Sequence, residues 1–296
     1  MSIEAEKPVV SVGGGAPPPA EPKPSALPGS SPLHAFLDAF LPNRVVSRGV
    51  MRIVIAAEVL LLLLIWLRSP FEVLPRPGEV FEALRWLWTT QGLGRDLFIS
   101  FRLNVTALFW TAVISLLLSY LTVLPAFRPI VAAASKARFL SLFGFTFVFT
   151  IMVGGGFHLQ LWLLVFAMTV FFVTSMASVI EQIPRGQFDH ARTLRMSEWR
   201  VVWEVVILGT ADKAFEVLRQ NAAIGWMMLT MVEGIVRGQG GIGVALLNLN
   251  KYTRLDGVFA IQIVILAVGL FQDYMIGVFR RLSCPYADLT IERQAR

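Results

Sequence analysis

Residues 159–180 read LQLWLLVFAMTVFFVTSMASVI and carry no charged side chain over 22 positions. A helix of about 20 apolar residues is long enough to cross the hydrocarbon core of a bilayer. The whole sequence agrees with this stretch, because 55% of its 296 residues are hydrophobic, 16% are charged and the mean hydropathy is +0.65. Soluble domains carry about 25% charged residues. The sequence therefore predicts a membrane protein and argues against a water-soluble domain.

Five further segments are apolar enough to be read as membrane-spanning helices. They cover residues 50–67, 97–124, 139–153, 218–236 and 258–279. The third segment, 139–153, is short, and 218–236 contains Arg219 and Glu233, so these two are marginal by length or by polarity. With all six segments counted, the predicted fold is an all-α membrane protein with six transmembrane helices.

The basic residues are distributed unevenly over the segments between the predicted helices. Eighteen of the 26 lysines and arginines fall on one side of the six-helix arrangement and seven fall on the other. Cytoplasmic loops carry the excess of Lys and Arg. Both termini are therefore predicted to be cytoplasmic. Membrane topology accounts for the net charge of +6, and no nucleic acid is expected as a partner.

The predicted membrane domain covers residues 50–282. Residues 1–32, rich in Pro and Gly and poor in large apolar residues, are interpreted as a disordered cytoplasmic tail. Residues 33–49 are interpreted as a cytoplasmic flank and residues 283–296 as a cytoplasmic tail.

Two segments between the predicted spans have patterns of their own. Residues 75–90 begin with prolines and continue with apolar residues at helical spacing, which predicts an amphipathic helix on the outer membrane surface. Those apolar residues are Val80, Phe81, Leu84, Leu87 and Trp88. Residues 181–217 make the longest polar stretch between spans, and we expect a partner protein to dock there.

A search for catalytic and metal-binding motifs finds none that fits its context. There is no GxxxxGK[ST] phosphate loop, and the three histidines are predicted to lie too far apart to share a metal. Residues 238–243, GQGGIG, match the letters of a dinucleotide-binding turn but lack a preceding strand, so we interpret them as a tight turn that ends the fifth span. We therefore predict that the chain is not an enzyme and holds no metal or cofactor of its own.

Charged residues within the predicted spans form a first group of candidate residues. Arg102, Glu233 and Asp273 could either line a pathway or pair one helix with another. The alternative is that they reach the membrane surface from helix ends or form ordinary ion pairs, for example Asp273 with Arg280 and Arg281. The sequence leaves both interpretations open.

A second group of candidate residues lies in a stretch that resembles a known motif. Residues 188–208 read FDHARTLRMSEWRVVWEVVIL and are similar to the cytoplasmic EAA loop of bacterial ABC importer permeases, most of all those of the nitrate, sulfonate, taurine and bicarbonate type. Similar motifs follow the family's order along the chain. They are LPRPGEV at 74–80, IP at 183–184, ARTL at 191–194, Trp226 with Glu233, GGIG at 240–243 and GLFQD at 269–273.

The resemblance implies a type I ABC importer permease fold and a loop whose short helix inserts into a cleft of a separate ATPase subunit. Carried over by position, the ATPase-coupling residues are Asp189, His190, Ala191, Arg192, Leu194, Arg195 and Met196. Four positions depart from the family's pattern. Asp189 stands where the family has Glu, His190 where it has the first Ala, Arg195 where it has Gly, and Leu208 where it has Pro.

The resemblance further implies the transmembrane subunit of an ATP-driven importer for a small anionic or organic solute, in the bacterial inner (cytoplasmic) membrane. The implied partners are ABC ATPase subunits, which would hold ATP and Mg, an extracytoplasmic solute-binding protein, and membrane lipid. The chain would also pair with a second permease copy or, given the altered loop, with a paralogous permease. The alternative is a degenerate permease-like subunit that serves as a scaffold or regulator beside a second permease.

Overall fold

The structure is a computed structural model that describes residues 48–68 and 74–285. Within these ranges the regular elements are all helices, and no strand occurs. The chain divides into two units, Met1–Arg68 and Ser69–Arg296, which are treated separately below. In the first unit the described element is α2 (Arg48–Leu67), which forms the predicted first helix. The predicted N-terminal tail and the end of the C-terminal tail lie outside the described residues.

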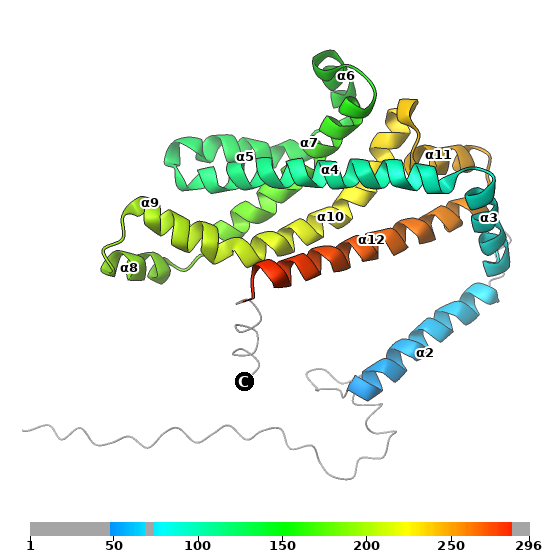
Figure 1. The fold of residues 1–296 in the computed structure, drawn as a ribbon, viewed down its shortest axis with the longest axis horizontal. Helices are drawn as coiled ribbons and strands as arrows, with labels where there is room; N and C mark the ends of the chain where they lie inside the picture. The colour runs from blue at the N-terminus through cyan, green and yellow to red at the C-terminus, as the bar shows by residue number, and fades with distance from the viewer. Residues whose placement is uncertain (1–47, 69–73, 286–296) are drawn as a thin grey trace, which may run out of the picture. The chain divides into compact units, whose positions relative to one another are not determined.

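The second unit is built around four long helices. They are α4 (Leu93–Tyr120), α7 (Phe157–Glu181), α10 (Ala211–Ile235) and α12 (Leu255–Ser283). α7 packs against α4 and α10, α4 also touches α10, and α12 packs against α10 (Figure 1). Leu103, Leu163, Met168 and Leu229 are fully buried where α4, α7 and α10 meet. These helices therefore carry the core of the unit.

The inner face of α4 is made of small and polar residues. Ser100, Asn104, Ala107, Thr111 and Ser115 are buried at helical spacing. Opposite them, a Cβ atom added to Gly225 of α10 would lie 2.8 Å from Met168 Cε and 3.2 Å from Asn104 Oδ1. Small residues allow membrane helices to approach closely. The close packing of α4, α7 and α10 therefore depends on this face and on Gly225.

Four helices are long and apolar enough to cross a membrane, and they correspond to four of the six predicted spans. They are Gly49–Leu67, Leu93–Val123, Phe157–Glu181 and Leu255–Ser283. α10 is 25 residues long, as α7 is, but its first half carries Asp212, Lys213 and Glu216, and it is not among the four. The structure thus supports an all-α, multi-pass membrane protein with four or five candidate spans in its described part.

The fifth candidate span is a bent pair of helices where the sequence predicted one short span at 139–153. α5 (Arg128–Lys136) and η4 (Ala137–Phe139) meet α6 (Leu142–Val153) at an angle of 118°. Leu140 and Ser141 have extended backbones, with ψ angles of 137° and 126°, and these two residues break the helix. α6 packs on α7, where Phe145 and Phe149 contact Phe166 with ring centroids 5.0 and 5.7 Å apart.

Helix α3 (Pro77–Thr89) occupies the segment predicted to be an amphipathic surface helix. The Arg76 N–H donates to the Glu79 carboxylate at 3.0 Å, which satisfies one of the free amides at the helix start. The predicted apolar face is divided in two. Val80 and Leu87 are buried toward the protein, where α3 packs on α12 and α4, whereas Phe81 and Trp88 are exposed. The helix therefore has a protein-facing side and a separate exposed aromatic side.

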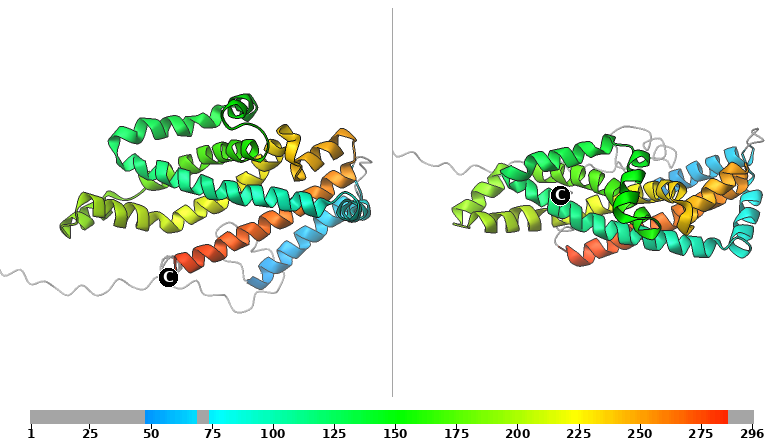
Figure 2. Two further views of the ribbon diagram at one scale, coloured as in Figure 1. Left: turned by 45° about the horizontal axis from the view of Figure 1, so that its top comes forward. Right: turned by 90° about the horizontal axis from the view of Figure 1, so that it is seen from above.

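Short helical elements connect the long helices. After α4 come η2 (Leu121–Val123) and η3 (Pro125–Phe127), and after α10 come η7 (Arg237–Gln239) and α11 (Ile242–Lys251). Between α7 and α10 lie α8 (Arg185–Thr193), α9 (Glu198–Val201), the π-helix η5 (Val202–Ile207) and the 3₁₀ turn η6 (Leu208–Thr210). Figure 2 shows from two further directions that α8 and α9 project past the ends of the long helices.

Candidate functional site

The segment 181–217 presents α8 as a short helix at one end of the unit. α7 ends at Glu181, Pro184 adopts an extended backbone as the N-cap of α8, and α9 leads back toward α10 (Figure 1). Within α8, Ala191 is buried at 5% exposure, whereas Asp189 and His190 are exposed. The helix therefore rests on its small residue and turns its charged residues outward.

An ion pair joins α8 to α9. Arg192 Nε lies 3.2 Å from Glu198 Oε1, and Arg192 Nη1 lies 3.9 Å from Asp189 Oδ1. The hydrogen bond from Glu198 raises the pKa of the Arg192 guanidinium further above its usual range, so the side chain stays charged. Exposed pairs of this kind add little to stability, and the contact serves here to link the two short helices.

The C-terminus of α8 is closed by a turn that favours glycine. The Arg195 N–H donates to the Arg192 carbonyl at 2.9 Å and the Met196 N–H donates to the Ala191 carbonyl at 3.4 Å. This pair of bonds defines a Schellman motif, in which the residue after the C-cap adopts a left-handed backbone. Arg195 occupies that position with a φ of 57°.

The structure places the coupling residues predicted from the sequence around this helix end, mostly at the surface. Asp189, His190, Arg192, Leu194 and Arg195 are exposed, Met196 is half-buried and Ala191 is buried. Leu194 is the large apolar side chain of the group, and 58% of it is exposed. The exposed set offers one acidic, several basic and one apolar side chain to a binding surface.

Asp273 and Arg102 both contact a neighbouring helix. Asp273 of α12 accepts from Arg219 of α10, with Oδ1 and Nε 2.8 Å apart. Arg280 of α12 lies 3.3 Å from Glu216 of α10, so a second ion pair joins the same helices one to two turns further along. The structure thus pairs Asp273 with Arg219 and not with Arg280 or Arg281. The Arg102 guanidinium lies over the Phe157 ring at 5.4 Å, between α4 and α7.

Glu233 is fully buried and lies against the N-terminus of α11. Ser100 Oγ donates to Glu233 Oε1 at 2.6 Å, and the Gly243 N–H donates to Oε2 at 2.7 Å. The Ile242 N–H donates to Ser100 Oγ at 2.9 Å, so the hydroxyl both accepts and donates. The first amides of a helix lack partners within the helix and attract negative charge. Glu233 therefore joins α10, α4 and α11 at one point.

Two glycines make this contact with Glu233 possible. Gly241 has a φ of 110°, and a Cβ atom added there would lie 2.5 Å from the Glu233 carboxylate. A Cβ atom on Gly243 would lie 2.8 Å from Glu233 Cβ and would also collide with the Thr230 carbonyl oxygen. The glycine-rich turn predicted from the sequence thus accommodates a buried acid from the preceding helix.

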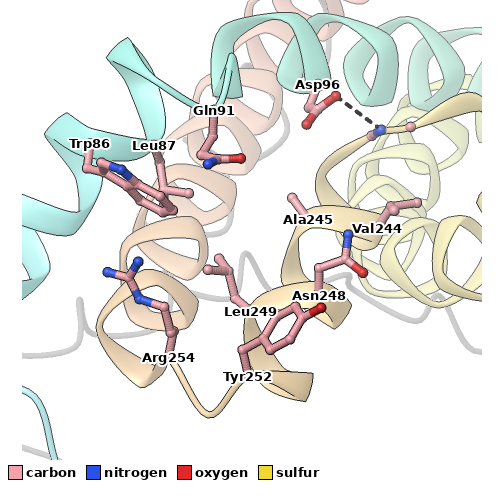
Figure 3. Close-up of a pocket in the computed structure, with 12 residues that line it drawn as sticks. Trp86, Leu87, Gln91, Asp96, Val244, Ala245, Asn248, Leu249, Tyr252 and Arg254 are labelled. Atoms are coloured by element: carbon pink, nitrogen blue, oxygen red, sulfur yellow. Dashed lines mark hydrogen bonds between the residues drawn. The ribbon is translucent and has the colours of Figure 1, made fainter.

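A cavity of about 440 Å³ lies beside the turn, between α3, α4 and α11. Figure 3 shows Trp86 and Gln91 on one side and Asn248 and Tyr252 on the other. Asp96 borders the cavity and accepts from the Gly241 N–H at 3.4 Å, the bond drawn dashed in Figure 3. The cavity was not predicted, because its lining comes from segments about 150 residues apart in the sequence.

Arg254 lines this cavity and contacts two other residues. Its guanidinium lies 4.4 Å from the centroid of the Trp86 ring and donates to Asp256 at 2.9 Å. Among the described residues, no three His, Cys, Asp or Glu side chains lie close enough together to hold a metal ion.

Comparison with known proteins gives partial matches. No family model matches the chain. Bicarbonate transport system permease protein CmpB of Synechococcus elongatus is 27% identical over 122 residues, 39% of this chain and 44% of that protein. CmpB of Synechocystis sp. is 24% identical over 126 residues, 40% of this chain and 45% of that protein. The putative ABC transporter permease protein MJ0413 of Methanocaldococcus jannaschii is 24% identical over 155 residues, 51% of this chain and 53% of that protein.

The predicted resemblance to ABC transporter permeases is confirmed. The chain spans about half the length of the curated relatives it matches. These relatives are named as transport proteins.

Two departures from the ABC permease pattern have a structural meaning in this chain. The pattern has Gly where Arg195 stands, and the left-handed backbone at that position is the conformation that Gly adopts without steric cost. The pattern has Pro where Leu208 stands. The Leu208 N–H donates to the carbonyls of Trp203 and Glu204, which a proline could not do.

Proposed function

We propose that the chain is the transmembrane subunit of an ATP-driven importer for a small anionic or organic solute. The observation that carries the proposal is α8, an exposed, charged helix that lies between the two long helices α7 and α10. α8 is joined to α7 by residues 182–184 and to α10 through α9, η5 and η6, so a force applied to α8 can reach both long helices. The partial similarity to ABC permeases supports the same role.

The energy would come from a separate subunit. The sequence has no phosphate loop, so ATP and Mg would be held by partner ATPase subunits that contact α8. Asp189 and His190 are directed outward, and Leu194 adds an exposed apolar contact. These residues, with Arg192, Arg195 and Met196 around the helix end, form the proposed coupling surface.

The proposed topology has six membrane crossings in the inner (cytoplasmic) membrane, with both termini in the cytoplasm. The bent pair α5–α6 and the long helix α10 would complete the four apolar spans. α3 would lie at the outer surface, with Phe81 and Trp88 available to the membrane interface. The excess of basic residues on the α8 side supports this orientation.

The remaining proposed partners are an extracytoplasmic solute-binding protein and a second permease, either another copy or a paralogue. Two relatives are named for bicarbonate transport, and a small anion of that kind is one solute class that we propose. Arg102, Glu233 and Asp273 hold helices together in the structure, and a role in the pathway would come through those helix contacts.

The alternative is a permease-like scaffold or regulator that no longer couples to ATP hydrolysis. Two observations favour it. His190 places a larger side chain on α8 where the family pattern has Ala, and Arg195 keeps a left-handed backbone that would be less strained with Gly.

Reconstitution with an ABC ATPase subunit from the same organism distinguishes the two functions. Asp189→Lys reverses the charge on the proposed coupling surface, and Glu82→Lys makes the same change on the exposed side of α3. If α8 couples ATP hydrolysis to transport, Asp189→Lys lowers both solute-stimulated ATP hydrolysis and uptake into proteoliposomes. Glu82→Lys should leave both rates near those of the parent chain. Solute-stimulated hydrolysis and uptake at background level in all three proteins would support the scaffold, and parental rates in Asp189→Lys would contradict a coupling role of Asp189.

A further inference from the structure

The helical run between α8 and the membrane helices changes its type three times. α9 passes into the π-helix η5, then into the 3₁₀ turn η6 and finally into α10. π-Turns inside helices are rare and often mark functional positions, and a 3₁₀ stretch within a helix often marks a hinge. Both irregularities lie within residues 202–210.

The hydrogen bonds of this stretch are shared or displaced. The Leu208 N–H is divided between the carbonyls of Trp203 and Glu204, five and four residues earlier. Thr210 has φ and ψ of −111° and 6°, outside the α-helical region, and its Oγ1 donates to the Val206 carbonyl at 2.7 Å. Sharp bends in helices occur at places of this kind, where a π-bulge or an inserted side chain interrupts the regular hydrogen-bond ladder.

On the α8 side of this stretch, α8 and α9 are held together as one unit, which we call the α8–α9 body. The Arg192–Glu198 pair joins α8 to α9, and the Schellman motif fixes the link between them. α8 makes its main contacts with α9 and η5. A cavity of about 500 Å³ lies between α8 and η5 on one side and η2 and α7 on the other. It is lined by Phe188 of α8 and Val206 of η5, with Thr122 of η2 and with Ala177 and Ile180 of α7.

On the membrane side, α10 is anchored. Val217 packs with Phe172 and Met176 of α7, and Leu116 and Tyr120 of α4 lie against the same cluster. Thr210 is buried at 2% exposure, with the Tyr120 hydroxyl 3.5 Å from its Oγ1. The stretch 202–210 therefore lies between the α8–α9 body, with a cavity beside it, and a helix held in the core.

We propose that residues 202–210 form a hinge about which the α8–α9 body swings relative to α10. The cavity beside Phe188 of α8 is the space into which this body moves, and Thr210 is the fixed end of the hinge. The hinge itself rests on these contacts alone, whereas its use in transport rests on the proposed function. The segment then acts as a jointed lever and not as a rigid extension of α10.

A one-residue deletion tests the hinge. A π-turn holds one residue more than an α-turn, so removing the exposed Glu204 lets the run close as an α-helix with Val201 and Val206 still on one face. Spin labels at Gln187→Cys and Met227→Cys, in a Cys284→Ser background, report the distance between α8 and α10 in the full-length chain in detergent. A second pair, Phe109→Cys with Met227→Cys, reports the distance between α4 and α10 within the bundle of long helices and is called the bundle pair.

We expect a broad α8–α10 distance distribution in the parent chain and in Glu204→Ala, and a narrow one in the deletion, close to the width of the bundle pair. Thr210→Val removes the bond to Val206 and should broaden the α8–α10 distribution while the bundle pair stays unchanged. If the parent distribution is already as narrow as the bundle pair, or if Thr210→Val leaves it unchanged, there is no hinge. Should the deletion disturb the bundle pair, Thr210→Val decides.

A second experiment tests the role of the hinge in transport, with the same spin labels in the complex with the ATPase. Trapping the ATP-bound state should shift the α8–α10 distance in the parent chain and leave it unshifted in the deletion variant, which should also lose uptake. A deletion variant with parental uptake would overturn the coupling role of the hinge. Failure of the parent chain to bind the ATPase would instead contradict the proposed function, and the detergent measurement would still decide the hinge.

Discussion

At the scale of single residues, Arg195 has a backbone conformation that predicts the effect of its substitution. A left-handed φ costs a residue other than Gly about 1–2 kcal/mol, and Arg195 has a φ of 57°. Arg195→Gly should therefore stabilise the end of α8 by about 1 kcal/mol after the greater freedom of Gly in the unfolded chain is allowed for. Amide exchange of α8 in the detergent-solubilised protein should become slower.

Arg200 provides the matched control for this substitution. It is exposed and lies in α9 with a helical backbone. Arg200→Gly should be destabilising by about 1 kcal/mol, because Gly is disfavoured within a helix. Equal exchange rates in the parent chain and in Arg195→Gly would contradict the left-handed backbone at Arg195.

Among the glycines in the described part of the chain, Gly243 has the least space for an added methyl group. Its Cβ would collide with the Thr230 carbonyl oxygen and lie 2.8 Å from Glu233 Cβ. Overpacking of this kind costs about 1–3 kcal/mol, so Gly243→Ala should lower the thermal unfolding temperature of the solubilised chain. Gly238→Ala, in the same turn with no atom within 4 Å, should have a much smaller effect. Equal thermal unfolding temperatures of the two variants would show that Gly243 does not pack against Glu233.

The sequence pointed to individual charged residues but not to their partners. Glu233 stood out as an acid within an apolar span, whereas Ser100, which hydrogen-bonds to it, lies 133 residues earlier and resembles any other serine. Pairing of Asp273 with Arg280 and Arg281 on the same helix was one interpretation that the sequence left open, whereas the packing of α10 on α12 pairs it with Arg219. Such pairings depend on how the helices pack against one another, and local sequence patterns do not predict that packing.

At the scale of elements, the ion pairs between α10 and α12 predict a coupled effect of two substitutions. Arg219→Asp and Asp273→Arg should each destabilise the chain, because each brings two like charges together across the helices. The double variant restores the pair in reverse and should recover stability, with a coupling energy of about 0.5–1 kcal/mol for partly exposed groups. Thermal unfolding of the four proteins in detergent measures it. Additive effects would mean that the two side chains do not interact.

Helix positions were predicted well where apolar runs are long, and less well where helices are short or polar. The runs at 50–67, 97–124, 159–180 and 258–279 correspond to α2, α4, α7 and α12. The segment 139–153 was expected as one span, but extended residues at 140 and 141 separate α6 from η4. On α3, spacing alone placed Phe81 with Val80, although packing on α12 and α4 divides them.

At the scale of the whole molecule, the six-span topology predicts which residues share a side of the membrane. In a Cys284→Ser background, single cysteines at Gln187 and Arg281 should react with a membrane-impermeant maleimide in inside-out vesicles. A cysteine at Glu82 should react in intact cells or spheroplasts, because α3 is proposed to lie outside. All three positions are exposed in the structure. Labelling of Glu82 and Gln187 from the same side would exclude the proposed topology.

The sequence predicted the membrane class and the similarity to ABC permeases because both depend on local properties. Composition and apolar run length indicate a bilayer, and ordered short motifs indicate the family. The cavity beside Asp96 and the π-helix before α10 could not be predicted, since the first depends on tertiary packing and the second on which carbonyl each amide selects.

The bend between η4 and α6 also bears on how the protein is made. α6 has twelve residues and is about 18 Å long at 1.5 Å per residue, which is short of the roughly 30 Å hydrocarbon thickness. It therefore covers only part of the bilayer by itself. Phe145 and Phe149 of α6 pack on Phe166 of α7, so we expect α6 to need α7 for a stable position in the bilayer. Insertion of α6 should then depend on α7.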